Sequence, residues 1–70
     1  MERGAVVSST LRSVGYDYQT RTLEIEFVNG RVYQYEDVPP EVYAELIEGP
    51  TKGRYFNAHI RNAFAYRQVA

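Results

Sequence analysis

The sequence predicts one small α+β domain, in which a small antiparallel sheet packs against two short helices. Three observations carry this prediction. Apolar and polar residues alternate along much of residues 11–35, and a period of two is typical of strands. The pair Asn29-Gly30 interrupts the alternation, as the turn of a hairpin does. After Pro39-Pro40 the apolar residues recur at helical spacing instead.

The length of 70 residues predicts a single domain over residues 9–70, preceded by a flexible N-terminal segment over residues 1–8. A chain of this size buries only about 60% of the surface that its unfolded form exposes, so its stability is small. The sequence has no cysteine, and therefore no disulfide framework or thiolate zinc ligand. Seven tyrosines and three phenylalanines are expected to build much of the core, because one aromatic ring can bury roughly 150–250 Å².

Three strands are predicted in the first half of the chain. The first is Leu11–Tyr18, and the next two, Leu23–Phe27 and Arg31–Tyr35, form a hairpin. A three-residue loop, Val28–Gly30, with its glycine in the left-handed region, gathers the apolar residues of both strands on one face. This register sets both tyrosines of the third strand on the packed side of the sheet. Residues 64–69 alternate as well and predict a fourth strand, at the C-terminus, which would pair with the first.

Two helices are predicted between the hairpin and the C-terminal strand. Pro39-Pro40 and Glu41 suit the first turn of a helix, and Gly49-Pro50 ends it. The second helix is expected to begin after Thr51 as its cap and to run over residues 52–62. The apolar residues that face the sheet are Val38, Val42, Leu46 and Ile47 in the first helix and Phe56 and Ile60 in the second.

Charge is distributed unevenly along the chain. Residues 1–48 hold four arginines against nine acidic residues, whereas residues 49–70 hold four cations and no acidic residue, within a net charge of −1. Two of these cations, Arg54 and Arg61, lie seven residues apart and would share one stripe of the second helix. The C-terminal segment is therefore the part of the chain that is expected to attract anions.

Residues 51–57 form the segment where we expect a ligand. Gly49 and Gly53 allow backbone amides to approach a ligand, and Lys52 and Arg54 add positive charge beside a helix N-terminus. This arrangement suits phosphate. The alternative is that the glycines serve a tight connection between the two helices and that the cations are only solvated.

Residues typical of catalytic and metal sites are sparse. His59 is the only histidine, and no serine has an evident base as its partner. Glu24 and Glu26 alternate on a strand and are expected on a solvated face rather than in an acid–base pair. We therefore predict that the protein is not an enzyme and has no catalytic residue, metal or cofactor. His59 would either contact a phosphate or a base, or lie partly buried in its helix.

The apolar run nearest the N-terminus, Ala5–Val7, is too short for a signal peptide or a membrane span. The absence of cysteine is compatible with a reducing compartment. We therefore expect a cytoplasmic protein with no membrane partner.

Several short motifs occur in a fixed order along the chain. They are Leu11–Asp17, Phe27 with Asn29-Gly30, Tyr33-Gln34-Tyr35, Val38-Pro39, and Gly53–Asn57 with Ile60-Arg61. Together they resemble the KTSC domain over about residues 8–69. That small module is named for its place at the C-terminus of some lysyl-tRNA synthetases, and it also occurs as a stand-alone bacterial protein. The resemblance implies an association with RNA, tRNA-like in kind, and matches Tyr33 and Tyr35 to the family's central Tyr-x-Tyr.

The sequence thus favours a non-enzymatic module that binds RNA or another nucleic acid through a C-terminal basic patch and tyrosines. The cations would contact phosphates, and an exposed ring would stack on an unpaired base, although tyrosines at alternate strand positions are also typical of a core. The expected site residues are Lys52, Arg54, Arg61, Arg67, Tyr33, Tyr35, Tyr55 and His59, with Arg12 and Arg31 extending the surface. The alternative is a protein-interaction or homo-oligomerisation module of unknown partner, because oppositely charged portions can pair. We expect a monomer or a weak homodimer.

Overall fold

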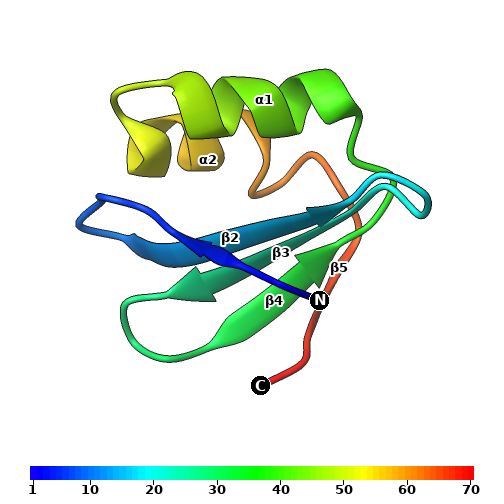
Figure 1. Ribbon diagram of the computed structural model, residues 1–70, viewed down its shortest axis with the longest axis horizontal. Helices are drawn as coiled ribbons and strands as arrows, with labels where there is room; N and C mark the ends of the chain where they lie inside the picture. Colours follow the sequence, from blue (N-terminus) through cyan, green and yellow to red (C-terminus); the bar gives the residue numbers. More distant parts are fainter.

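A computed structural model describes the whole chain, residues 1–70. The elements follow in the order β1 (Gly4–Ala5), β2 (Leu11–Asp17), β3 (Thr22–Phe27), β4 (Val32–Tyr35), α1 (Pro40–Glu48), α2 (Lys52–His59) and β5 (Tyr66–Gln68). The strands form one sheet in sequence order, and each is antiparallel to the next. Both helices cover the same face of this sheet (Figure 1), which we call the inner face. The predicted α+β class is confirmed, with one strand more than expected.

The hairpin of β3 and β4 has the predicted register. Leu23 lies opposite Tyr35, and Ile25 lies opposite Tyr33, so the apolar residues of both strands share the inner face. Gly30 has a φ angle of 91°, in the left-handed region that glycine adopts without steric cost. The three-residue loop therefore sets the register, and both tyrosines lie on the packed side.

The core lies between the inner face of the sheet and the two helices. Its nine buried residues are Leu11, Val14, Leu23, Ile25, Tyr35, Val38, Leu46, Phe56 and Ile60. Phe56 and Ile60, which the sequence predicts on the buried side, are 4% and 1% exposed. Burying one such side chain contributes about 1.5–3 kcal/mol, so a few residues dominate the stability of this short chain.

Both helices begin where the sequence predicts. α1 has Pro40 in its first turn and is followed by Gly49, whose N–H donates to the carbonyl oxygen of Glu45. α2 begins at Lys52, but its expected cap, Thr51, forms no side-chain hydrogen bond with the helix. Thr51 is thus the N-cap residue, as predicted, but its side chain does not cap the helix.

The end of α2 differs from the prediction. The helix ends at His59, and the N–H groups of Ile60 and Arg61 both donate to the carbonyl oxygen of Phe56, at 3.0 and 2.9 Å. This shared acceptor interrupts the α-helical pattern, so Arg61 lies beyond the helix. The stripe that Arg54 and Arg61 were expected to share is therefore absent.

β5 pairs with β4 rather than with the first predicted strand. Tyr66 lies opposite Tyr35, and Gln68 lies opposite Tyr33. Pairing with β2 is unavailable because β1 occupies that edge. The C-terminal strand thus brings Tyr66 beside the two tyrosines of the hairpin.

The N-terminal segment takes part in the sheet. Residues 1–8 were expected to precede the domain as a flexible segment, but Gly4–Ala5 pairs with β2. Gly15 of β2 permits this close approach, because a Cβ at its position would lie 2.4 Å from the carbonyl oxygen of Glu2. The folded domain therefore begins before the expected boundary at residue 9.

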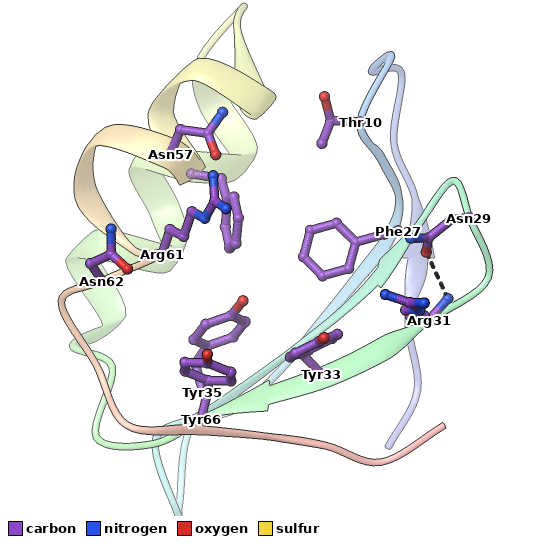
Figure 2. Close-up of a pocket in the computed structure, with 11 residues that line it drawn as sticks. Thr10, Phe27, Asn29, Arg31, Tyr33, Tyr35, Asn57, Arg61, Asn62 and Tyr66 are labelled. Carbon is purple, nitrogen blue, oxygen red and sulfur yellow. Dashed lines mark hydrogen bonds between the residues drawn. The ribbon is translucent and has the colours of Figure 1, made fainter.

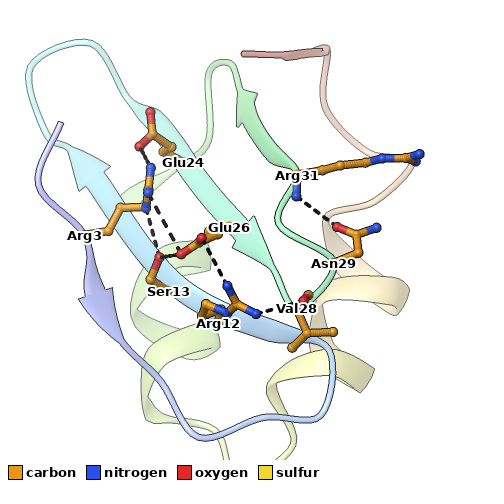
Figure 3. A network of polar contacts seen from close by, with 8 residues as sticks. All are labelled: Arg3, Arg12, Ser13, Glu24, Glu26, Val28, Asn29 and Arg31. Atoms are coloured by element: carbon orange, nitrogen blue, oxygen red, sulfur yellow. Dashed lines mark hydrogen bonds and ion pairs between the residues drawn. The ribbon is translucent and has the colours of Figure 1, made fainter. Parts of the chain in front are cut away.

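The outer face of the sheet carries a polar network (Figure 3). Arg3 donates to the carboxylate of Glu24 and, at 2.9 Å, to the hydroxyl of Ser13, while Gln34 donates to Glu24 at 2.8 Å. Glu24 is only 6% exposed, so its expected place on a solvated face is wrong. Burial of Glu24 opposes ionisation, but the hydrogen bonds from Gln34 and Arg3 outweigh it and lower the pKa of this carboxyl.

Candidate functional site

A cleft of about 370 Å³ opens between the C-terminal part of α2 and the inner face of the sheet. Asn57 of α2, with Arg61 and Asn62 of the turn that follows it, forms one wall, and aromatic rings form the wall on the sheet (Figure 2). The lining residues are Thr10, Phe27, Asn29, Arg31, Tyr33, Tyr35, Phe56, Asn57, Arg61, Asn62 and Tyr66. None of them is acidic, although acidic residues outnumber cations in the chain as a whole.

The sheet side of the cleft is an aromatic floor. Phe27, Tyr33 and Tyr35 come from the hairpin, and Tyr66 comes from β5. The ring centroid of Tyr33 lies 5.6 Å from that of Phe27 and 5.6 Å from that of Tyr66. Tyr66 is 56% exposed, whereas Tyr35 is 3% exposed. The accessible aromatic surface is therefore Tyr66 together with the half-buried Tyr33.

Tyr35 belongs to the core as well as to the floor of the cleft. Burial, with further contributions from Tyr33 and Tyr66, raises the pKa of Tyr35 to about 12. Its hydroxyl is therefore neutral at physiological pH. Tyr35 cannot serve as an open stacking surface, but it supports the ring of Tyr66, whose centroid lies 5.5 Å away.

Two guanidinium groups, those of Arg31 and Arg61, flank the cleft on opposite sides (Figure 2). Both side chains are exposed. Neither forms an ion pair, because the three ion pairs of the structure all join Arg3 or Arg12 to Glu24 or Glu26. With no acidic residue in its lining, the cleft is electropositive and suits an anionic ligand.

Amide side chains complete the rim of the cleft. Asn57 and Asn62 are exposed on the helical side, and Asn29 lies at the hairpin turn, where its side-chain oxygen accepts the N–H of Arg31 at 3.0 Å. An asparagine amide offers two donors and an acceptor. The rim can therefore form hydrogen bonds to a polar ring edge held above the aromatic floor.

Three of the eight expected site residues meet in this cleft: Tyr33, Tyr35 and Arg61. Arg31, which was expected to extend the surface, lies there as well. Lys52 and Arg54 instead line a separate groove of about 280 Å³ between the first turn of α2 and the loop from β1 to β2. Three of the four cations expected in the C-terminal patch thus divide between two cavities, and the fourth, Arg67, lies outside both.

The other expected residues, Tyr55, His59 and Arg67, lie outside both cavities. The ring centroids of Tyr55 and the exposed His59 are 4.6 Å apart. Burial and a hydrogen bond from the Tyr55 hydroxyl to Glu45, at 2.8 Å, raise the pKa of Tyr55 to about 12. Arg67 lies on the outer face, where it donates to Gln34 at 3.2 Å. The eight residues therefore do not form a single surface.

Sequence reasoning missed Tyr66, Asn57 and Asn62. The alternation of residues 64–69 indicates that Tyr66 and Gln68 share a face, but it does not say which strand they join. Asn57 ends the segment of residues 51–57 where a ligand was expected, but it was given no role of its own, and Asn62 follows no pattern in the sequence. Only the fold places them around the tyrosines of the hairpin.

No group of three or more His, Cys, Asp or Glu side chains is arranged to hold a metal ion. Neither helix is long and apolar enough to cross a membrane.

Comparison with known proteins gives consistent matches along nearly the whole chain. The model of the KTSC domain matches residues 7–64. An uncharacterized protein of Stutzerimonas stutzeri is 53% identical over 57 residues, which are 81% of this chain and 80% of that protein. A lysine–tRNA ligase of Nostoc punctiforme is 40% identical over 62 residues, which are 89% of this chain and 11% of the ligase. The crystal structure of a KTSC domain protein from Yersinia pestis, 37% identical, has a TM-score of 0.93 and covers 99% of this chain and 97% of its own.

Proposed function

We propose that this chain, which belongs to the KTSC domain family, is a non-enzymatic module that binds single-stranded RNA in the cleft between α2 and the sheet. One observation carries the proposal. A single cavity combines an exposed tyrosine ring with two guanidinium groups that lack ion-pair partners, and no acidic residue lines it. Aromatic rings beside cations are the arrangement that binds unstacked bases and their phosphates.

In this proposal an unpaired base stacks on the rings of Tyr66 and Tyr33. Tyr66 is open to solvent, while its neighbours on β4 hold it in place. Stacking of one base on such a ring is worth about 1–3 kcal/mol and tolerates any base, because every base has a π-face. The bases of a duplex are stacked on one another, so this floor favours a single strand.

The two arginines then contact the phosphates on either side of the stacked base. A guanidinium group binds phosphate through two parallel N–H donors, and Arg31 and Arg61 stand on opposite sides of the aromatic floor. The amides of Asn57 and Asn62 would contact the edge of the base. Because the affinity depends on neutralising phosphates, it is expected to fall steeply with salt.

The relatives support RNA as the nucleic acid. One of them is a lysine–tRNA ligase, and this chain corresponds to 11% of that protein's length. A domain within an enzyme that acts on tRNA lies close to RNA whenever the enzyme binds its substrate. From the ligase we take only this RNA context, and we propose separately that the module works in the cytoplasm.

A titration with a labelled single-stranded oligoadenylate tests the proposal, using the wild-type protein, Arg61→Gln and Arg21→Gln. Arg21 is an exposed arginine in the turn between β2 and β3, outside the cleft, and serves as the charge-matched control. Arg61→Gln should weaken binding several-fold and reduce the salt slope by about 0.7, whereas Arg21→Gln should change neither. The proposal fails if the wild-type protein does not bind RNA or if both variants lose affinity equally. A DNA oligonucleotide bound with equal affinity would remove the preference for RNA.

One observation favours the alternative of a protein-interaction module. β5 forms an edge of the sheet, and all three of its residues are exposed. Unpaired backbone groups along such an edge can pair with a strand of another chain. Sedimentation of the free protein tests this alternative, which predicts a dimer whose population rises with concentration, whereas the RNA proposal expects a monomer.

A further inference from the structure

The groove that contains Lys52 and Arg54 adjoins the aromatic cleft. Its volume is about 280 Å³, and it lies between residues 7–10 and residues 50–54. Thr10 lines both cavities. The groove therefore continues the cleft along the seam between α2 and the loop from β1 to β2.

The lining of this groove is cationic and rich in hydroxyl groups. Its two charged residues are Lys52 and Arg54, and Ser8, Ser9 and Thr10 face them from the loop. None of its lining residues is acidic, and neither cation takes part in an ion pair. Cations and hydroxyl donors without carboxylates are the groups that bind a phosphate.

The loop that supplies the hydroxyls has a fixed conformation. The Ser8 hydroxyl oxygen accepts the backbone N–H groups of Thr10, at 3.1 Å, and Leu11, at 3.3 Å. With its oxygen engaged as an acceptor, the O–H group of Ser8 remains a donor. The groove thus presents a hydroxyl donor that the fold itself orients.

Gly53 sets the distance between the two walls of the groove. A Cβ at this position would lie 3.0 Å from the Thr10 hydroxyl oxygen and 3.3 Å from its Cβ. Glycine therefore allows the first turn of α2 to contact the loop directly. Lys52 is held beside it, since its Nζ donates to the carbonyl oxygen of Gly49 at 3.0 Å and keeps two further hydrogens for a ligand.

We infer that this groove is a second phosphate-binding subsite for the same strand, a conclusion that rests on the proposed function. One nucleotide stacks its base in the cleft, the strand passes Thr10, and a later phosphate lies between Lys52, Arg54 and the loop hydroxyls. Val7, a groove residue that is 94% exposed, offers an apolar contact to the adjoining sugar. The ligand class is therefore a single-stranded oligonucleotide rather than a mononucleotide.

The test measures the binding of a labelled single-stranded oligoadenylate to three variants at several salt concentrations. The groove variant is Lys52→Gln with Arg54→Gln, and the cleft variant is Tyr66→Ala. The control, Arg21→Gln with Arg67→Gln, removes the same charge from outside both cavities. The groove variant should lose about tenfold in affinity or more and about 1.4 in the salt slope, as two lost phosphate contacts predict for a single strand. The control should stay within about twofold of the wild-type protein.

The results distinguish a failure of the second subsite from a failure of the RNA-binding cleft. If the groove variant matches the control while Tyr66→Ala loses affinity, the second subsite is refuted and the cleft proposal stands. If Tyr66→Ala also matches the wild-type protein, the proposed function fails and the inference fails with it. If the double variant misfolds, the single variant Arg54→Glu replaces it. Arg54 is exposed, so this variant should fold, and it should also weaken binding.

Discussion

Tyr66 of β5 lies opposite Tyr35 of β4, and their ring centroids are 5.5 Å apart. Tyr35 is buried and Tyr66 is exposed, so this pair joins the hydrophobic core to the open cleft. Tyr35 is fixed in turn by Phe56 of α2, whose ring centroid lies 5.6 Å away. The cleft therefore has a rigid floor, on which Tyr66 and the half-buried Tyr33 are accessible to a ligand.

Tyr66→Ala should weaken RNA binding by about 1–3 kcal/mol, because it removes the stacking surface. The loss of unfolding free energy should be small, because Tyr66 is 56% exposed. The matched control is Tyr18→Ala, since Tyr18 is 67% exposed and its ring contacts Tyr16 and Tyr43, outside the cleft. Fluorescence polarisation and urea denaturation measure the two quantities. An equal loss of affinity in both variants would contradict the assignment of Tyr66.

Tyr35 should make folding stability depend on pH in the alkaline range. Its pKa is raised by burial from 10.0 to about 12 in the folded state. A raised pKa contributes stability that is fully present below the unfolded value and is lost as pH rises through the folded one. The unfolding free energy should therefore decline between about pH 10 and about pH 12. Tyr35→Phe should make this decline shallower in urea titrations, while Tyr55, whose pKa is also raised to about 12, still contributes to it. An unchanged pH profile would speak against the burial of the Tyr35 hydroxyl.

Arg3→Ala should destabilise the fold by about 1–3 kcal/mol at neutral pH, because Glu24 loses a charged donor while it is only 6% exposed. The pKa of Glu24 is lowered in the folded state from 4.5, so the carboxylate contributes stability above that value, and the contribution is lost as pH falls through the lower folded pKa. The difference between the wild-type protein and Arg3→Ala should therefore shrink in acid. Arg21→Ala is the control, and it should cost little at any pH.

Gly15→Ala should displace β1 from the edge of the sheet. The new Cβ would lie 2.4 Å from the carbonyl oxygen of Glu2, and relieving such an overlap costs about 1–3 kcal/mol. Gly4→Ala is a matched control within the same strand pair, because nothing lies within 4 Å of its Cβ. Hydrogen exchange at the amides of β1 and β2 reports the displacement. Equal protection in both variants would show that the N-terminal segment does not depend on Gly15.

The parts of the fold that the sequence predicted correctly are those with local signals. The alternation of Leu23–Phe27 and the pair Asn29-Gly30 together determine the hairpin register, because a one-residue slip would move every apolar side chain to the other face. The helix boundaries at Pro40 and Lys52 follow from proline and glycine in the same way. The KTSC resemblance, drawn from short motifs, is confirmed by the matches to the family model and to the Yersinia pestis structure.

The parts that failed depend on contacts between distant segments. β1 has two residues, too few to show a periodicity, and the alternation around β5 does not say which strand it joins. The partners of both strands are decided by which sheet edges remain free. Glu24 has the pattern of a solvated residue, yet Arg3, the residue just before β1, covers it. Successive side chains of β5 point to opposite faces of the sheet. Because Tyr66 points to the inner face, Arg67 lies on the outer face.

The candidate site was only partly predictable for the same reason. Charge segregation identified Arg61 and the hairpin motif identified Tyr33, and the fold brings these two together. Arg31 and Tyr66 join them through the pairing of β3, β4 and β5, which is a property of the whole sheet. Lys52 and Arg54 were predicted for one shared patch with Arg61, but they lie in the first turn of α2 and line another cavity, whereas Arg61 follows the other end of the helix.

The most direct test of the cleft is a map of backbone amide chemical shifts during titration of the ¹⁵N-labelled wild-type protein with a single-stranded oligoadenylate. The account predicts saturable changes at Asn57, Arg61, Asn62 and Tyr66, with small changes in the turn around Arg21. Saturable changes confined to the outer face or to that turn, or no changes at all, would contradict the assignment of the cleft as an RNA-binding site.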